Sequence, residues 1–309
     1  MKIGFAGAGG IACYFGTLFS RAGCDVTLFG RGEHIRTIAE KGLSITINGE
    51  QDTLPVRTVD TLDTRTLERV LPALDWLFIT CKAHQSDVLI MAVKEFLSEK
   101  TQIITLQNGV DSSRNVSRLL PNKVFPGLSI RFVSHIVRPG EVEAKGDGYI
   151  IVGQEPCGRA TALDDFVATL NQSSIDIRIS ENIRRELWRK LTLNNGVNPL
   201  CAVTGLDSGR ALANPVSAAL IDELMKEAAL AASGDGICLT EEDITELRFI
   251  IEGLGTAKPS MQIDLENGRI PELDAICGAV IKYADLAAKN VPVTRTIASL
   301  LELKLTGVR

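Results

Sequence analysis

The sequence of 309 residues predicts two domains of different class, an α/β domain over residues 1–181 and an all-helical domain over residues 182–309. Three observations support this fold. The chain opens with an apolar strand, a glycine-rich turn, a helix and a second strand. Short apolar runs then recur, as is typical of buried parallel strands. Beyond about residue 180, the apolar residues follow the period of a helix instead.

Residues Lys2–Arg31 are the first predicted unit of the α/β domain. An apolar strand reaches a tight turn at Gly7, a helix follows, Gly23 ends that helix, and Asp25–Gly30 makes a second strand. Strand, helix and strand in this order, within about thirty residues, are how a Rossmann-type dinucleotide-binding domain begins.

The rest of the α/β domain is predicted from apolar runs and turn residues. Asn48-Gly49 within an alternating stretch indicates a β-hairpin. Pro139-Gly140 marks a turn between strands that we expect to be antiparallel. The other predicted elements are strands at Trp76–Thr80 and Gln102–Leu106, strands within Val124–Val152, a helix from Thr161, and a strand that ends at Ser180.

Five helices are predicted in the second domain. The first is expected to end where Gly196 and Pro199 interrupt it, because both residues disfavour a helix interior. Pro215 suits a first helical turn, and Thr240 followed by Asp243 is a capping pattern. The predicted helices are Arg184–Asn195, Pro215–Ser233, Glu241–Gly253, Ile270–Lys289 and Thr294–Leu305.

Composition narrows the class of function. The net charge is −5 without a long block of like charge, which argues against nucleic acid and anionic membranes as partners. No apolar run is long enough to span a bilayer. The seven cysteines are odd in number and form no C-x-x-C pair, and the three histidines are scattered. We therefore expect no disulfide framework, no metal site and a cytoplasmic location.

The first turn carries the pattern G-x-G-x-x-A. The first glycine permits the turn, the second lets a pyrophosphate approach the backbone, and the small third residue lets the helix pack near the strand. The phosphates would then lie at the helix N-terminus, where free N–H groups favour an anion. A tight turn without a ligand is the alternative. The predicted cofactor-binding residues here are Gly7, Ala8, Gly9, Gly10, Ile11 and Ala12.

The second strand ends in Arg31 rather than in an acid. An acid at this place would bind a free ribose 2′-hydroxyl, whereas an arginine suits a 2′-phosphate. Arg31 therefore favours NADP(H) over NAD(H), although Glu33 lies close in sequence and a solvated arginine is the alternative.

Polar residues follow two later strands. Lys82 comes after the strand Trp76–Thr80, and Asn108 comes after Gln102–Leu106. Because ligands of parallel sheets bind at the carboxyl ends of the strands, both side chains could reach a cofactor there. Ordinary surface or capping roles are the alternative.

Lys190, Asn194 and Asn198 stand four residues apart along a predicted helix. At about 100° per residue they spread over roughly 80° of one helical face. An ammonium group beside neutral carboxamides suits proton donation to a carbonyl that receives a hydride. The alternative is a lysine that extends to solvent and asparagines that pair with nearby backbone.

The ordered set of motifs resembles the ketopantoate reductase (2-dehydropantoate 2-reductase) family over essentially the whole chain. The matching stretches are GAGGIA, Arg31, CKAHQ, QNG, WRKLTLNNGVNPL, the PSM, GR and ELD elements between residues 259 and 274, and Gly278. The resemblance implies NADPH bound between a Rossmann-type domain and a helical domain. It also implies NADPH-dependent reduction of a small 2-oxo acid, with ketopantoate in pantothenate biosynthesis as the leading substrate.

The resemblance also implies roles for individual residues. It makes Lys190 the catalytic proton donor and Glu272 the acid that orients this lysine and the substrate. It places Lys82 and Asn108 beside the nicotinamide and its ribose. The positions that it assigns to the substrate are Asn194, Asn198, Ser208 and Ser260.

Two positions depart from the family pattern. Ser208 and Ala257 stand where the family usually has asparagine. Loss of two carboxamides would change the hydrogen bonds offered to a hydroxylated 2-oxo acid. Three alternatives stay open: a paralogous reductase of another 2-oxo acid, a related hydroxy-acid or opine-type dehydrogenase, and a non-catalytic NADP(H)-binding sensor. A homodimer formed through the helical domain is also open.

Overall fold

The computed structural model describes residues 1–170, 173, 175–253 and 255–307. The chain divides into two compact units. The first consists of Met1–Gln107 and Ser112–Ile183, and the second of Asn108–Asp111 and Arg184–Arg309. A short piece of the N-terminal half of the sequence therefore belongs to the second unit. No helix in the described part of the chain is both long and apolar enough to cross a membrane.

A mixed sheet organises the first unit. Its strand order is β4-β3-β9-β8-β7-β6-β1-β2-β5, with β10 beside β9. The pairs from β8 through β7, β6, β1 and β2 to β5 are parallel. The strands are β1 (Lys2–Ala6), β2 (Asp25–Gly30), β3 (Leu43–Ile47), β4 (Glu50–Leu54), β5 (Arg57–Asp60), β6 (Trp76–Ile79), β7 (Gln102–Thr105), β8 (Val124–Arg138), β9 (Glu141–Gly153) and β10 (Ile177–Ser180).

The helices of this unit stand between the strands in the sequence. They are α1 (Gly10–Arg21), α2 (Glu33–Lys41), α3 (Thr64–Val70), α4 (Ser86–Val93), α5 (Ser112–Leu119) and α6 (Thr161–Leu170), with 3₁₀ turns η1 (Leu71–Ala73), η2 (Ala83–Gln85) and η3 (Lys94–Phe96). The predicted α/β class is confirmed, whereas α2 to α5 have no counterpart among the elements predicted from the sequence.

Both faces of the sheet are buried, which explains the continuous apolar runs. Along β6, Trp76 and Phe78 join one apolar cluster, whereas Leu77 and Ile79 join another. Successive side chains of a strand point to opposite faces, so each cluster lies on its own side of the sheet. The rings of Phe5 and Phe78 stack with centroids 4.9 Å apart in the first cluster.

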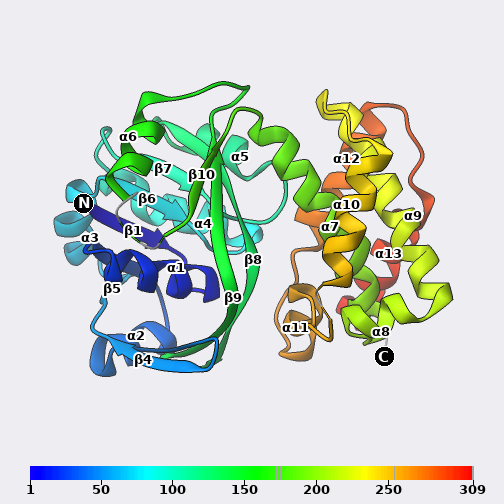
Figure 1. The fold of residues 1–309 in the computed structure, drawn as a ribbon. Coiled ribbons are helices and arrows are strands. Elements are labelled where there is room, and N and C mark those ends of the chain that lie inside the picture. The colour runs from blue at the N-terminus through cyan, green and yellow to red at the C-terminus, as the bar shows by residue number, and fades with distance from the viewer. Residues whose placement is uncertain (171–172, 174, 254, 308–309) are drawn as a thin grey trace. The chain divides into compact units, whose positions relative to one another are not determined.

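The predicted hairpins are present. Asn48 and Gly49 both have positive φ, 52° and 90°, as the turn between antiparallel β3 and β4 requires. Strands β8 and β9 pair antiparallel and run as long neighbours (Figure 1). Their register shifts between Ile130 and Phe132, where Arg131 has a φ of 63°.

The second unit is helical, as predicted. Its elements are α7 (Ile183–Thr204), α8 (Ser208–Ala213), α9 (Pro215–Ala232), the 3₁₀ turn η4 (Ser233–Asp235), α10 (Glu241–Glu252), α11 (Ser260–Glu266), the π-helical turn η5 (Asp274–Gly278), α12 (Ala279–Leu286) and α13 (Pro292–Thr306). Pro215 starts α9, and Thr240 and Asp243 form the reciprocal capping box of α10. Both predicted helix starts are confirmed.

The predicted end of the first helix is wrong. Helix α7 continues through Gly196 and Pro199 to Thr204. A Cβ on Gly196 would lie 2.7 Å from Cγ of Met225, so this glycine permits close packing against α9 rather than ending the helix. Tertiary packing thus outweighs the local cost of the proline.

The helix predicted over Ile270–Lys289 is also shorter than expected. Regular structure begins at Asp274 with the π-turn and ends with α12 at Leu286. The short helices α8 and α11 were not predicted, because six or seven residues carry too little periodicity to stand out.

Candidate active site

The glycine turn of the first unit fits a dinucleotide. Gly7 has a φ of 107°, and a Cβ there would lie 2.3 Å from the backbone nitrogen of Cys81. Gly9 precedes α1 with an ordinary φ of −83°, yet a Cβ there would meet nothing within 4 Å. The first turn of α1 also holds no acidic residue. The N–H groups in the first turn of an α-helix have no partner within the helix, so the start of α1 offers donors of the kind that bind a pyrophosphate.

The predicted cofactor residues run from the loop after β1, Gly7 to Gly9, into the first turn of α1, Gly10 to Ala12. Ala12 is buried within α1, where its small side chain belongs to the core of the sheet. Arg31 directly follows β2 and is exposed, as a residue that receives a phosphate group must be before binding.

The loops after β6 and β7 are joined by a glutamine that sequence reasoning left without a role. Gln107 donates from Nε2 to the carbonyl of Cys81 at 2.8 Å and to Oγ of Ser86 at 2.6 Å. Thr80 donates from Oγ1 to the carbonyl of Gly7 at 2.9 Å. These bonds fix the carboxyl ends of β1, β6 and β7 together and hold the backbone at half-buried Lys82. The place of Gln107 directly after an apolar strand was the available signal in the sequence.

The second unit carries the polar stripe on α7. Lys190 is half-buried, and Asn194 and Asn198 are buried. All three lie on one continuous helix, so the separation of four residues holds along its length.

Lys190 has an unusual proton affinity for a lysine. Burial lowers its pKa to about 8, and the negative charge of Glu272 acts in the opposite direction. Desolvation disfavours the ammonium form, and a nearby carboxylate partly restores it. A lysine in this state donates a proton more readily near neutral pH than an exposed lysine does.

Glu272 is buried and held by an amide. Asn108 donates from Nδ2 to Oε2 of Glu272 at 2.8 Å. Both residues belong to the second unit, since Asn108 lies in the short segment Asn108–Asp111. The structure therefore brings together Asn108, Lys190 and Glu272, three of the residues predicted from the sequence.

The two remaining predicted residues stand at helix starts. Ser260 is exposed at the first position of α11. Ser208 is buried at the first position of α8, and its hydroxyl donates to the carbonyl of Ala257 at 3.0 Å. The two positions that depart from the family pattern are thus in direct contact. The role of Ser208 toward a substrate stays a prediction.

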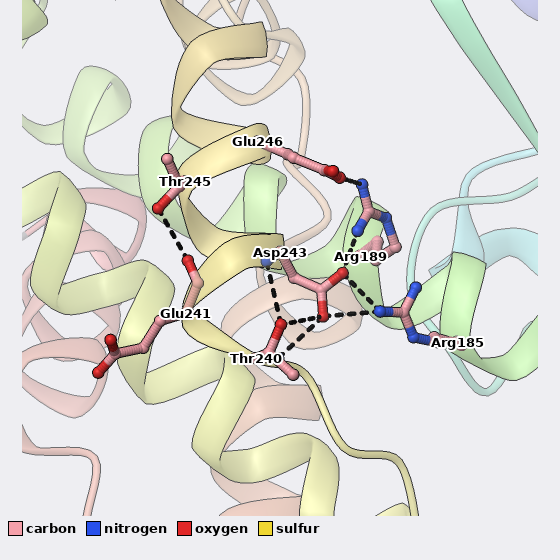
Figure 2. Close-up of polar contacts among 7 residues, drawn as sticks. All are labelled: Arg185, Arg189, Thr240, Glu241, Asp243, Thr245 and Glu246. Atoms are coloured by element: carbon pink, nitrogen blue, oxygen red, sulfur yellow. Dashed lines mark hydrogen bonds and ion pairs between the residues drawn. The ribbon is translucent and has the colours of Figure 1, made fainter.

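An ion-pair network fixes α7 beside the lysine (Figure 2). Arg185 donates to both carboxylate oxygens of Asp243, at 2.6 and 2.7 Å, and Arg189 contacts Asp243 and Glu246. Asp243 also closes the capping box of α10 with Thr240. Burial alone would raise the pKa of Asp243, but the backbone N–H of Thr240 and the two arginines hold it below its usual range. The network ties α7 to the start of α10.

Comparison with known proteins shows which protein family this chain matches. Residues 3–156 match the family described as ketopantoate reductase PanE/ApbA, and residues 182–305 match its C-terminal domain. A protein of Pyrococcus horikoshii named 2-dehydropantoate 2-reductase is 28% identical over 98% of this chain and 97% of its own length.

Solved structures agree on the fold. The structure of a 2-dehydropantoate 2-reductase from Geobacter metallireducens superposes with a TM-score of 0.89, at 28% identity and over 98% of this chain and 100% of that one. A D-mandelate dehydrogenase in complex with NADH and anilino(oxo)acetate superposes with a TM-score of 0.90 over 99% of both chains, at 23% identity. The same fold therefore serves reductases and dehydrogenases with different substrates.

The two family matches together span most of the chain. The chain belongs to the ketopantoate reductase family, and it is an oxidoreductase that acts on a CH–OH group with a nicotinamide dinucleotide.

Proposed function

We propose that this protein reduces a small 2-oxo acid to the 2-hydroxy acid with NADPH, and that ketopantoate is the leading candidate substrate. The observation that carries the proposal is the half-buried Lys190, with its lowered pKa, under the influence of the buried carboxylate of Glu272. An ammonium group of this kind suits protonation of an alkoxide that develops as hydride reaches the carbonyl carbon.

The cofactor supplies the hydride, and the chain supplies binding and proton donation. The turn from Gly7 to Ala12 would hold the pyrophosphate, and Arg31 would hold a 2′-phosphate, which favours NADPH over NADH. Lys82 would lie near the nicotinamide end. Asn194, Asn198 and Ser260 would hydrogen-bond the carboxylate and carbonyl of the substrate. Glu272 would keep Lys190 charged and aligned.

Replacement of Lys190 tests the mechanism. Lys190→Ala should lower kcat by about a hundredfold or more, the usual range for loss of a general acid, with little change in NADPH affinity. Lys226→Ala is the matched control. Lys226 is an exposed lysine of the same unit, and its Nζ lies 3.7 Å from Oε2 of Glu223, a long distance for an ion pair. Turnover of Lys190→Ala within tenfold of the wild-type value would contradict the assigned role.

A specific observation favours a second candidate substrate, a 2-oxo acid without a distal hydroxyl group. The hydroxyl of Ser208 donates a hydrogen bond to the carbonyl oxygen of Ala257, and the backbone N–H of Ser208 donates to the same oxygen at 3.1 Å. Two positions that could have offered carboxamides to a hydroxyl group thus bond to each other. A site built for a hydroxyl loses discrimination when its partners are absent.

A panel of 2-oxo acids separates the two candidates. NADPH oxidation would be followed with ketopantoate and with acids of similar size that lack the hydroxyl group. A kcat/KM for ketopantoate above that of the others supports ketopantoate reduction. The reverse order supports the second candidate, and tight NADPH binding without oxidation by any acid would contradict both.

A further inference from the structure

The segment Asn108–Asp111, here called the strap, belongs structurally to the helical unit although β7 precedes it in the sequence. Every residue of the strap contacts that unit. Asn108 bonds to Glu272, and Gly109 approaches Ala275 so closely that a Cβ would lie 2.7 Å from its carbonyl oxygen. Gly109 also has a φ of 92°, a conformation that other residues rarely adopt.

A buried ion pair forms the first anchor of the strap. Arg184 donates from Nη1 to the carbonyl of Val110 and from Nη2 to the carboxylate of Asp235. The side chains of Arg184 and Asp235 are only 3% and 6% exposed. Trp188 donates from Nε1 to Asp235 at 2.8 Å. A buried charge pair that is bonded on several sides restricts its partners to one geometry.

A carboxylate forms the second anchor. Asp111 accepts from Nζ of Lys282 at 2.6 Å and from the hydroxyl of Tyr283 at 2.5 Å. Burial would raise the pKa of Asp111, but these two bonds and the charge of Lys282 hold it below its usual range. Asp111 is therefore ionised at neutral pH, and both bonds persist there.

The two anchors join through a pair of rings. Trp188 and Tyr283 meet edge to face, with centroids 5.2 Å apart. The contacts therefore form a closed chain that begins and ends on the strap. It leaves the strap at Val110, passes through Arg184, Asp235, Trp188 and Tyr283, and returns at Asp111. Because the strap is bound at its second, third and fourth residues, the first residue, Asn108, has little freedom of its own.

We propose that Arg184, Asp235 and Tyr283 are positioning residues, which hold the strap so that the Asn108 amide fixes the carboxylate of Glu272 for its work on Lys190. This inference rests on the proposed function for its catalytic readout. It adds that alignment of Glu272 is set within the helical unit, by a segment that the chain inserts from its N-terminal half.

Tyr283→Phe is the sharpest test, because it removes one hydroxyl and keeps the ring beside Trp188. We expect kcat to fall about five- to tenfold, with the Kd of NADPH unchanged. This is less than the roughly ten- to hundredfold that one lost hydrogen bond to a charged group represents, because the loss reaches Glu272 only through the strap. Asn108→Ala should lower kcat at least as much. The double variant should lose no more than Asn108→Ala alone, since both changes act through the same amide.

Glu227→Gln is the matched control. Glu227 is buried in the same unit and accepts from the backbone N–H groups of Val293 and Thr294 at the start of α13, remote from the strap in its contacts. It should lower thermal stability without a change in kcat of the folded protein. Additive losses for Tyr283→Phe and Asn108→Ala would overturn the proposal. So would a similar loss of kcat in Glu227→Gln, because kcat would then follow stability rather than the strap.

A second measurement does not depend on turnover. The pKa of Lys190 can be followed by NMR of ¹³Cε-labelled lysine, with its signal assigned by loss in Lys190→Ala. The charge of Glu272 raises this pKa, so Tyr283→Phe should lower it by moving the carboxylate. An unchanged pKa would overturn the proposal even if no 2-oxo acid were turned over, and inactivity of the wild type would concern the proposed function alone.

Discussion

The ammonium group of Lys190 lies where burial favours loss of its proton, with a pKa of about 8 against an ordinary value of 10.5. If the charged form is the proton donor, kcat/KM should decrease above about pH 8. The decrease would be measured as a pH profile of 2-oxo acid reduction.

Unfolding does not explain such a decrease. The unfolded chain binds a proton at this residue more tightly than the folded one, so stability from Lys190 increases as the pH rises from about 8 to 10.5. Thermal unfolding across the same range is the control. A flat activity profile up to pH 10 would contradict proton donation by Lys190.

Gly9 offers a second test at the residue scale. Gly9→Ala should leave stability almost unchanged, since its φ is −83° and the added Cβ would meet nothing within 4 Å. The methyl group would enter the space proposed for the pyrophosphate, so we expect the Kd of NADPH to rise about tenfold or more. Fluorescence titration with NADPH measures it, and equal affinity would place the phosphates elsewhere.

Helix ends give a prediction at the scale of the element. Ala288 follows α12 with a φ of 51°, and the backbone N–H of Lys289 donates to the carbonyl of Ala284. This is the position at which glycine closes a helix with least strain. Ala288→Gly should therefore stabilise the protein by about 1 kcal/mol, measured by urea unfolding.

The neighbouring alanine is the matched control. Ala287 has a φ of −89°, so Ala287→Gly gains nothing from positive φ and should destabilise the protein by about 0.5–1 kcal/mol. Equal effects of the two changes would show that strain at Ala288 is negligible.

Elements whose signal is local were predictable from the sequence. The turn at Asn48-Gly49 and the capping box at Thr240 are set by residues within four positions of each other. The end of α7 was not predictable, because Gly196 acts through Met225 of another helix. For the same reason Lys190 and Glu272 were found by motif, whereas the anchors Arg184 and Asp235 were not: their partnership is visible only when the chain is folded.

The helical unit is built from two separate parts of the sequence, residues 108–111 and residues 184–309. A fragment of residues 184–309 would lack the strap, which leaves Arg184 without the Val110 carbonyl and Tyr283 without Asp111. We expect this fragment to be less stable than the same residues in the intact protein, by about 3 kcal/mol or more for several lost bonds to charged groups.

Hydrogen exchange of α7 and α12 compares the fragment with the intact chain. The control is the same fragment with residues 108–111 attached through a flexible linker, which should recover part of the protection. Equal protection with and without the strap would contradict its contribution to the stability of the unit.

The π-helical turn at Asp274–Gly278 has a consequence for insertions and deletions. Such a turn arises when a helix holds one residue more than its α-helical geometry accommodates. Five residues wound at about 4.4 per turn rotate the backbone roughly as far as four α-helical residues do, so removal of one residue there would restore regular winding with little rotation. Glu272 lies just before the turn, so its aim should survive the loss of one residue within the turn. Loss of one residue within α12, where no turn absorbs the change, would instead rotate the residues on either side by about 100° relative to each other.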